Sequence, residues 1–295
     1  MDFKSILNEY ANKTNEYLAE CCGNDDSALE LIFDAERYSL LSGGKRIRAY
    51  LVFELCRMFG KSEKEAAPFA CAVEMVHAYS LIHDDLPCMD DDDYRRGKPT
   101  SHKVYGEAVA VLAGDALLTK AFETAANNKN VCPEVAVAAV ASLAQAAGDR
   151  GMVGGQILDI KAEESSERDL SMLEKIHRLK TGAMIKVSAK LGCLAAGVDD
   201  DSEIMSDVVK YAENIGYAFQ IVDDILDVVG DSALLGKNVG SDKENDKLTF
   251  MSFYTVDEAS ALASRLTDEA ITVISKYENS ENLVALAKYL LKRNH

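Results

Sequence analysis

Apolar residues recur at three- and four-residue spacing along almost the whole chain, and only four prolines interrupt its 295 residues. This spacing gives an α-helix one apolar face. Turn-forming or acidic segments at 23–26, 126–133, 163–169, 199–202 and 230–247 separate about ten helices or more. The sequence shows no sustained strand alternation, linker or strict repeat. We therefore predict an all-α fold in which residues 1–295 form a single domain.

Composition limits the partners that this chain can have. With 48% hydrophobic residues it can bury a large core, and its net charge of -17 would repel DNA or RNA, so no nucleic-acid partner is expected. The first residues lack the pattern of a signal peptide, and the most apolar stretch, 135–147, is too short to span a bilayer. Seven cysteines without zinc-site spacing suit a reducing compartment. We expect a cytoplasmic protein with no membrane span.

Two aspartate clusters, within residues 84–93 and 223–227, follow apolar helical segments. A buried carboxylate needs a cationic partner, because an unpaired buried charge is very costly. Aspartates three or four residues apart share a helix face, and such oxygen ligands suit Mg²⁺, which keeps positions for water or phosphate oxygens. Residues 91–93 can equally form a solvated acidic loop. The predicted metal ligands are Asp84, Asp85, Asp90, Asp223 and Asp227.

The first cluster ends a predicted helix that Ser62 caps and that Pro87 terminates, since a residue before proline disfavours helical geometry. Seven residues make nearly two turns, so His77 and Asp84 share a face of this helix. Alone, His77 would be interpreted as a core histidine. In the second cluster, the residue at 220 shares a face with the aspartates at 223 and 227, and apolar neighbours leave no ordinary solvent face.

Basic residues are scarce, so their clusters are informative. Residues 43–48, GGKRIR, place a flexible turn before three cations, and Arg95-Arg96-Gly97-Lys98 follows the first aspartates. Arginine offers a planar fork that matches phosphate oxygens. Lys180-Thr181 marks a helix break, and Lys237 lies after the second cluster. Each group can also be surface charge or charge balance, but together they would serve two separate diphosphates.

In these motifs, the chain resembles the short-chain trans-prenyl diphosphate synthases, most of all the bacterial farnesyl diphosphate synthases, or geranyltranstransferases. The resemblance spans nearly the full length. It is carried by GGKRIR, HAYSLIHDDLPCMDDDDYRRGKPT, the KTG turn, FQIVDDILD and GKNVGSD in the family's order and spacing. It implies a bundle of helices around a central cavity and Mg²⁺-dependent condensation of isopentenyl diphosphate with dimethylallyl or geranyl diphosphate. The implied product is farnesyl diphosphate.

The resemblance also implies roles for individual residues. The diphosphate of isopentenyl diphosphate would be bound by Gly44, Lys45, Arg48, His77 and Arg96. The allylic diphosphate would be clamped by Arg95, Lys180 and Lys237, with Thr181 and Gln220 near the reacting carbons. Three Mg²⁺ ions are implied: two at Asp84 and Asp90 with Asp85 nearby, and a third at Asp223, supported by Asp227. The residues expected to be catalytic are Asp84, Asp90, Arg95, Lys180 and Asp223.

Product length should depend on Tyr79, which lies five residues before Asp84, about 7.5 Å along a helix. In the family an aromatic residue near this position tends to stop growth at fifteen carbons, and Tyr79-Ser80 is typical of the bacterial farnesyl enzymes. The motif with Pro87 and Cys88 between its aspartates also occurs in producers of twenty-carbon geranylgeranyl diphosphate, which is the main alternative. A homodimer is implied as well.

Three further alternative functions differ in the binding sites that they require. A class I terpene cyclase needs only one diphosphate site, and the set of Lys45, Arg48 and Arg96 speaks against it. A non-catalytic subunit of a heteromeric prenyltransferase would be expected to lose an aspartate motif, and both are present. A simple acidic metal-binding protein would not need the basic clusters.

Overall fold

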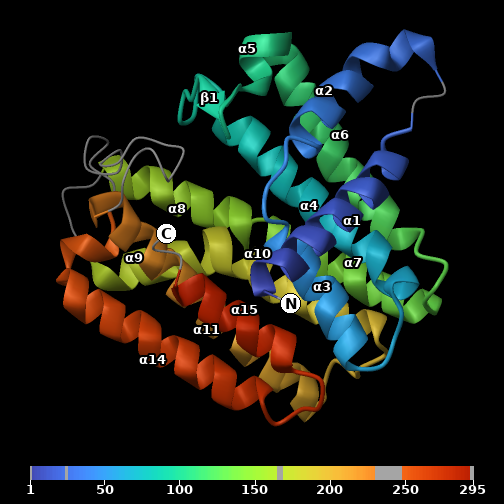
Figure 1. Ribbon diagram of the computed structural model, residues 1–295. Helices are drawn as coiled ribbons and strands as arrows, with labels where there is room; N and C mark the ends of the chain where they lie inside the picture. Colours follow the sequence, from blue (N-terminus) through green and yellow to red (C-terminus); the bar gives the residue numbers. More distant parts are fainter. Residues whose placement is uncertain (1, 24–25, 165–168, 230–247, 293–295) are drawn as a thin grey trace. The chain divides into compact units, whose positions relative to one another are not determined.

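The computed structural model describes residues 2–23, 26–164, 169–229 and 248–292 (Figure 1). In these residues the regular structure is helical except for one pair of two-residue antiparallel strands, so the all-α prediction is confirmed. The chain divides into two compact units. The first unit comprises residues 1–141 and 194–197, and the second comprises 142–193 and 198–295. A single domain over 1–295 remains a prediction.

The first unit is built from helices and the short hairpin. Its elements are α1 (Phe3–Cys21), η1 (Ser27–Leu29), α2 (Glu30–Leu40), α3 (Ile47–Met58), α4 (Glu63–Asp84), β1 (Tyr94–Arg95), β2 (Lys98–Pro99), α5 (Ser101–Tyr105) and α6 (Glu107–Ala126). Helix α7 (Pro133–Ala147) follows. The predicted breaks at 23–26 and 126–133 are confirmed by the end of α1 and by the gap between α6 and α7.

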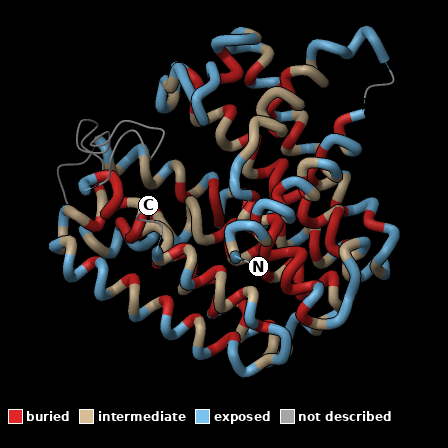
Figure 2. Tube along the Cα trace, in the orientation of Figure 1, coloured by how far each residue is buried: buried red, intermediate tan, exposed pale blue. Residues whose placement is uncertain are grey.

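Helix α4 is the central element of the first unit and is buried on most of its sides (Figure 2). Its predicted ends are confirmed, since it runs from Glu63 to Asp84 and the Ser62 hydroxyl accepts a hydrogen bond from the Lys64 amide at 3.3 Å. Pro68 lies inside the helix and cannot donate to the Lys64 carbonyl. The Asn130 side chain donates to that carbonyl instead, at 2.9 Å. A side chain from the α6–α7 connection thus compensates the missing backbone bond.

The start of α3 is fixed by a buried ion pair. Arg46 has a left-handed backbone (φ 50°) and donates to the Glu74 carboxylate of α4 at 3.0 Å, and both side chains are almost fully buried. Arg46 also donates to Asn15 of α1 and to the Leu40 carbonyl at the end of α2. The second Glu74 oxygen accepts from the Ala49 amide at 3.1 Å. One ion pair therefore joins four helices beside the GGKRIR turn.

The second unit is also helical. Its elements are α8 (Met152–Glu164), α9 (Leu170–His177), η2 (Arg178–Gly182), α10 (Ala183–Ala195), α11 (Glu203–Val229), η3 (Phe250–Ser252), α14 (Val256–Ile274) and α15 (Glu281–Leu291). The break expected at 199–202 is confirmed, and the segment 230–247 lies outside the described residues. No helix among the described residues is long and apolar enough to cross a bilayer.

Helix α11 is the long central element of the second unit. Its apolar residues 218, 221, 222, 225 and 226 form a buried cluster with Phe250 of η3 and with alanines 259 and 263 of α14. Asp224 interrupts this apolar face, and its carboxylate accepts a hydrogen bond from the Phe250 amide at 2.8 Å. Asp224 thus holds η3 against α11, while the side chains predicted to be functional lie elsewhere on the same helix.

Candidate active site

The first aspartate motif lies where α4 ends. Asp84 is the last residue of the helix, Asp85 caps it, and the Asp90 amide donates to the Asp84 carbonyl at 2.9 Å. This backbone bond closes the seven-residue loop 84–90, so that both ends of the motif are adjacent. Asp84 is half-buried and Asp90 is exposed. The predicted ligands Asp84 and Asp90 therefore come from one compact loop.

Asp85 is the buried member of the motif, with 3% of its surface exposed. Its carboxylate accepts a hydrogen bond from Arg95 Nε at 2.5 Å, and Arg95 also contacts Asp92 at 3.0 Å. Burial raises the pKa of Asp85 to about 6, although the Arg95 cation opposes this shift. Arg95, which the sequence assigns to a substrate diphosphate, is thus paired with carboxylates of its own loop. Its contact with substrate remains a prediction.

The position of these carboxylates is unfavourable for the helices that carry them. The carboxyl end of a helix has a partial negative charge, which destabilises a carboxylate within the last turn. Asp84 ends α4, and Asp227 lies in the last turn of α11, which has no basic residue there. Cationic ligands would remove this repulsion. The donor set of carboxylate oxygens fits Mg²⁺, which prefers oxygen ligands.

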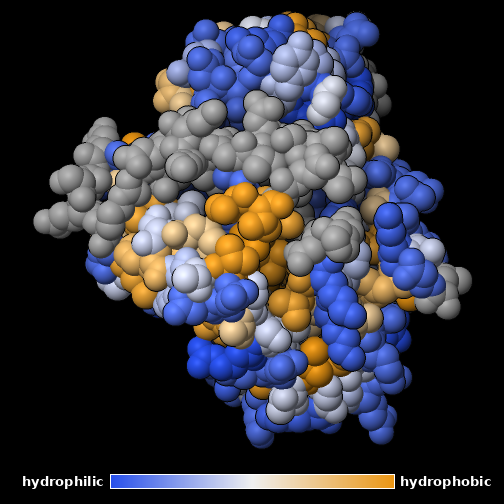
Figure 3. Space-filling model, turned by 60° about the vertical axis from the view of Figure 1, so that its left-hand side comes forward, coloured by the Kyte–Doolittle hydropathy of each residue, from blue (hydrophilic) through white to orange (hydrophobic). Residues whose placement is uncertain are grey.

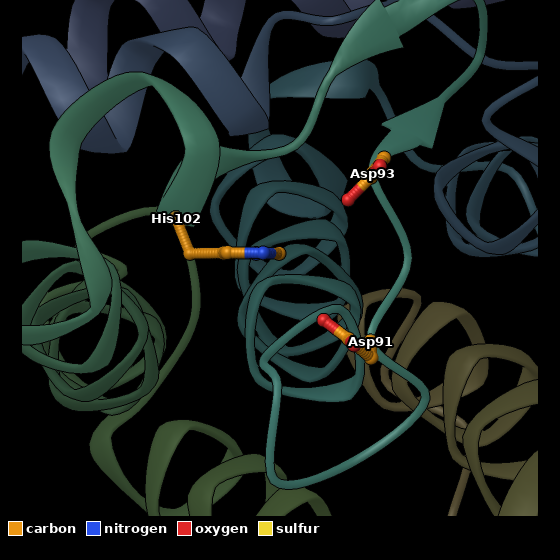
Figure 4. Close-up of side chains that lie close together, drawn as sticks. All are labelled: Asp91, Asp93 and His102. Carbon is orange, nitrogen blue, oxygen red and sulfur yellow. The ribbon is translucent and has the colours of Figure 1, made fainter.

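A second group of possible metal ligands follows the motif. The ligand atoms of Asp91, Asp93 and His102 lie within 4.8 Å of one another, so this cluster can bind a metal ion. Both carboxylates and the imidazole ring are directed toward the same space (Figure 4). Asp93, however, is already paired with Lys103 at 2.6 Å, and Asp91 has a left-handed backbone. A metal ion here would compete with the Lys103 ammonium.

The predicted binding group for isopentenyl diphosphate gathers around His77. The pKa of His77 lies well below its usual range because of burial and the nearby cations Arg48 and Arg96. Neither arginine forms an ion pair with a described residue, and the buried Arg48 Nε has no hydrogen-bond partner among them. Arg96 donates to the Gly43 carbonyl and, at 3.4 Å, to Ser42 Oγ. Two guanidinium groups beside one imidazole, without a carboxylate partner in the described part of the chain, form a site for an anion.

Glycine is required at position 44 by this arrangement. The backbone of Gly44 has φ 118°, a conformation that other residues rarely adopt. A Cβ atom there would lie 2.9 Å from the guanidinium carbon of Arg96. The predicted residues Gly44, His77 and Arg96 therefore lie together, and Arg48 is near enough to His77 to lower its pKa. Lys45 is exposed at the start of α3, and its predicted role remains untested.

Tyr79 is buried on α4, one turn before His83, and the two rings meet edge to face with centroids 5.7 Å apart. Burial and the charge of Asp84 raise the pKa of Tyr79 to about 12, so the phenol stays neutral. His83 in turn contacts the Val111 carbonyl of α6 at 3.0 Å. Ser80 donates to the His77 carbonyl and thus satisfies its hydroxyl within the helix. The Tyr79 ring is therefore held firmly by its neighbours.

The second aspartate motif lies on α11. Asp223 is half-buried and Asp227 has 3% of its surface exposed. Gln220, one turn earlier, accepts hydrogen bonds at its amide oxygen from Thr181 at 3.3 Å and contacts His177 Nδ1 at 3.0 Å. Thr181 and Gln220 thus contact each other, and their predicted place near the reacting carbons remains a prediction.

Lys180 and Thr181 lie in η2, a π-helical turn, which is a rare conformation that is common at functional sites. Lys180 pairs with Asp159 of α8 at 2.5 Å. The backbone of the turn packs directly on Gly155 of α8, where a Cβ atom would lie 2.3 Å from the Lys180 nitrogen. Helix α8 therefore fixes the position of the predicted clamp residue Lys180. Lys237 lies outside the described residues.

Helix α8 also carries an exposed apolar stripe. Val153, Ile157 and Ile160 follow at four- and three-residue spacing and expose 45%, 51% and 36% of their surfaces. Figure 3 shows apolar side chains gathered on one face of the molecule. Exposed apolar surface of this kind is typical of a binding site. The stripe lies on the same helix as Asp159, which pairs with Lys180.

Sequence reasoning missed several residues of the site. Asp159, His177 and the pair of Arg46 with Glu74 were not selected, although each contacts a predicted residue or its turn. His177 could have been found from its spacing, since it precedes Thr181 by four residues and therefore lies on the same side of a helical turn. The partners of Asp159 and Glu74 come from distant helices, and no local pattern indicates them.

Comparison with known proteins agrees with these motifs. A family model described as polyprenyl synthetase matches residues 30–290. The chain is 43% identical to farnesyl diphosphate synthase of Escherichia coli K12, over 100% of both chains. It is 45% identical to geranylgeranyl diphosphate synthase of Cyanophora paradoxa, over 90% of this chain and 88% of that protein. The apo crystal structure of an FPP/GFPP synthase from Zymomonas mobilis superposes with a TM-score of 0.88 at 36% identity, covering 98% of each chain. The chain belongs to the polyprenyl synthetase family of prenyltransferases.

Proposed function

We propose that this prenyltransferase condenses isopentenyl diphosphate with dimethylallyl or geranyl diphosphate to give farnesyl diphosphate and diphosphate. The observation that carries the proposal is the pair of cations Arg48 and Arg96 beside His77, which have no carboxylate partner among the described residues. Lys180 on the second unit supplies another cation, which pairs with Asp159 of α8.

We propose that Mg²⁺ ions, three in number, are held by Asp84, Asp85 and Asp90 of the first motif and by Asp223 and Asp227 of the second. The proposal is supported by three carboxylates at helix ends that disfavour negative charge: Asp84 is half-buried, and Asp85 and Asp227 are buried. When bound, Mg²⁺ neutralises the charge that develops on a departing diphosphate. The cluster of Asp91, Asp93 and His102 is a less suitable site, because Lys103 already neutralises Asp93.

Side chains of the protein would bind the two substrates and stabilise the allylic cation. Lys180 and Arg95 would hold the allylic diphosphate as its carbon–oxygen bond breaks, which leaves an allylic cation. The Thr181 and Gln220 oxygens would stabilise that cation without attacking it. The alkene of isopentenyl diphosphate, held by Arg48, Arg96 and His77, would then attack, and the departing diphosphate would accept the released proton. Water must be excluded, because it would quench the cation.

Farnesyl diphosphate is the proposed product because Tyr79, a large buried side chain, precedes Asp84 by five residues on α4. Contacts with His83 restrain its ring. Geranylgeranyl diphosphate is the alternative, since the relatives include synthases named for either product at almost equal identity. A homodimer and a cytoplasmic location remain proposals as well.

Replacing Tyr79 tests the product length. Tyr79→Ala should shift the product from fifteen toward twenty or more carbons, because removing the ring opens space beyond the first aspartates. Tyr79→Phe is the matched control, since it keeps the ring and loses only the hydroxyl, and its product should stay at fifteen carbons. Products would be measured by mass spectrometry after incubation with geranyl diphosphate, excess isopentenyl diphosphate and Mg²⁺. An identical distribution in wild type and Tyr79→Ala would exclude Tyr79 as the length determinant.

The same incubation of the wild-type protein tests the function itself. Condensation that requires both diphosphates and Mg²⁺ supports the proposal, and the mass of the product identifies its length. Conversion of a single allylic diphosphate to a cyclic hydrocarbon, without consumption of isopentenyl diphosphate, would instead identify a terpene cyclase. Formation of a twenty-carbon product alone would establish the alternative.

A further inference from the structure

His177 is the last residue of α9 and directly precedes the π-helical turn with Lys180 and Thr181. Its side chain is 13% exposed. The ring stacks on Phe250 of η3, with centroids 5.1 Å apart and planes 12° from parallel. Nδ1 lies 3.0 Å from the amide oxygen of Gln220 on α11. One side chain thus connects α9, η3 and α11, three residues before the predicted clamp residue Lys180.

The direction of the hydrogen bond follows from the protonation of His177. Burial lowers the pKa of His177 to about 4, so the imidazole is neutral at physiological pH and carries one N–H. The buried Nε2 has no hydrogen-bond partner among the described residues, and the nearest carboxylate oxygen, on Asp224, lies 3.8 Å away. A carbonyl oxygen can only accept. The proton therefore lies on Nδ1, which donates to Gln220.

The Gln220 oxygen accepts a second hydrogen bond from the Thr181 hydroxyl, at 3.3 Å. A carbonyl oxygen has two lone pairs, so both are used. Two donors from different elements fix the plane of an amide that would otherwise rotate about three side-chain bonds. Because Thr181 directly follows Lys180, the same contact also restrains the turn that carries the clamp residue.

We propose that His177 is a positioning residue for prenyl transfer, holding the Gln220 amide and the Thr181 hydroxyl in the orientation that condensation requires. This inference rests on the proposed function, in which these two side chains lie near the reacting carbons. In this role His177 acts through Gln220 and Thr181 rather than by contact with the reacting atoms. Its removal should lower kcat by about 10- to 100-fold, the usual effect of losing a residue that orients a reacting group. The KM for isopentenyl diphosphate should change less than about twofold, because the cations around His77 are untouched.

Two substitutions separate the hydrogen bond from the packing of the ring. His177→Phe keeps a ring to stack on Phe250 but has no N–H, and its kcat should fall by the full 10- to 100-fold. His177→Asn places an amide N–H near the position of Nδ1 without the ring, and its kcat should recover to within about fivefold of wild type. Equal losses in both variants, or an unchanged kcat in His177→Phe, would overturn the inference.

Tyr217→Phe is the matched control. The Tyr217 ring also packs on Phe250, with centroids 5.3 Å apart, and its hydroxyl donates to Glu174 at 2.9 Å but not to Gln220. Loss of this hydroxyl should leave kcat unchanged. A decrease as large as that of His177→Phe would show that losing a hydrogen bond elsewhere around Phe250 lowers kcat as much as losing the bond to Gln220, and would overturn the inference.

Gln220→Met completes a double-mutant cycle with His177→Phe. It keeps the length of the Gln220 side chain and removes the amide. If His177 acts only through Gln220, the double variant His177→Phe, Gln220→Met should lose no more kcat than Gln220→Met alone. Multiplication of the two losses would contradict the inference.

Nitrogen-15 NMR at pH 7 gives a readout besides activity. Wild type should show the Nδ1–H tautomer for one histidine, and that signal should disappear in His177→Phe. If His177 of the wild-type protein is protonated at Nε2 instead, the inference is also overturned.

The assay of wild type keeps the two proposals distinguishable. A wild-type protein that turns over both diphosphates, with an equally active His177→Phe variant, would reject the positioning role alone. A wild-type protein with no condensation activity would reject the proposed function, and the positioning role with it.

Discussion

Asp84→Asn and Asp223→Asn are each expected to lower Mg²⁺-dependent condensation by at least about 100-fold, because each removes a charged oxygen ligand at the proposed point of diphosphate departure. The amide has nearly the same shape as the carboxylate, so packing is preserved. The measurement is kcat with saturating geranyl and isopentenyl diphosphates over a range of Mg²⁺ concentrations. A loss that higher Mg²⁺ partly reverses would indicate weakened metal binding.

The free energy of unfolding of the Asp84→Asn variant provides a second test. Asp84 ends α4, where the partial charge of the helix is negative, so neutralising it should leave the free energy of unfolding unchanged or raise it by about 0.3–1 kcal/mol. Activity and stability should therefore move in opposite directions, as expected for a residue retained for function. If Asp84→Asn instead unfolds the protein at a lower urea concentration, its carboxylate has a structural role.

A surface aspartate provides the control. Asp200 forms an exposed ion pair with Lys190, at 2.7 Å, and lies in neither motif. Asp200→Asn should retain wild-type kcat and nearly wild-type stability, because exposed ion pairs contribute little. Wild-type turnover in both Asp84→Asn and Asp223→Asn would contradict the proposed metal site.

The helices that carry the site could be predicted from the sequence because their signals are local. Ser62 and Pro87 mark the start and the end of α4, and both the cap and the boundary occur as expected. The spacing of Gln220, Asp223 and Asp227 indicates one helix face, and the three residues lie on α11. A family resemblance carried by long motifs identified the family correctly.

Other features depend on contacts that no local pattern encodes. The π-helical turn at 178–182 is stabilised by Gly155 packing from α8, and β1–β2 are too short to produce strand alternation. The sequence predicts that Arg95 binds phosphate, but its pairing with the buried Asp85 required the folded loop. His177 has no sequence signal apart from its spacing to Thr181, since its hydrogen bond crosses to a helix more than forty residues away.

Arg46 shows how one motif can contain both structural and functional cations. In GGKRIR the three basic residues are adjacent, yet Arg46 is buried against Glu74 whereas Lys45 is exposed and Arg48 lies near His77. The left-handed backbone of Arg46 turns its side chain into the helices of the first unit. The ion pair therefore determines the direction of α3 and, with it, the position of Arg48.

Glu74→Ala is accordingly expected to destabilise the protein by about 3–5 kcal/mol, because it leaves the buried Arg46 guanidinium without a countercharge and the Ala49 amide without an acceptor. The measurement is the free energy of unfolding in urea. Glu63→Ala is the matched control on the same helix: its carboxylate pairs with Lys13 at 2.5 Å but is 45% exposed, so its loss should cost at most about 1 kcal/mol. Equal destabilisation by the two substitutions would mean that solvent reaches Arg46. In that case the buried pair would not fix α3, and the anion site around His77 would need another source of rigidity.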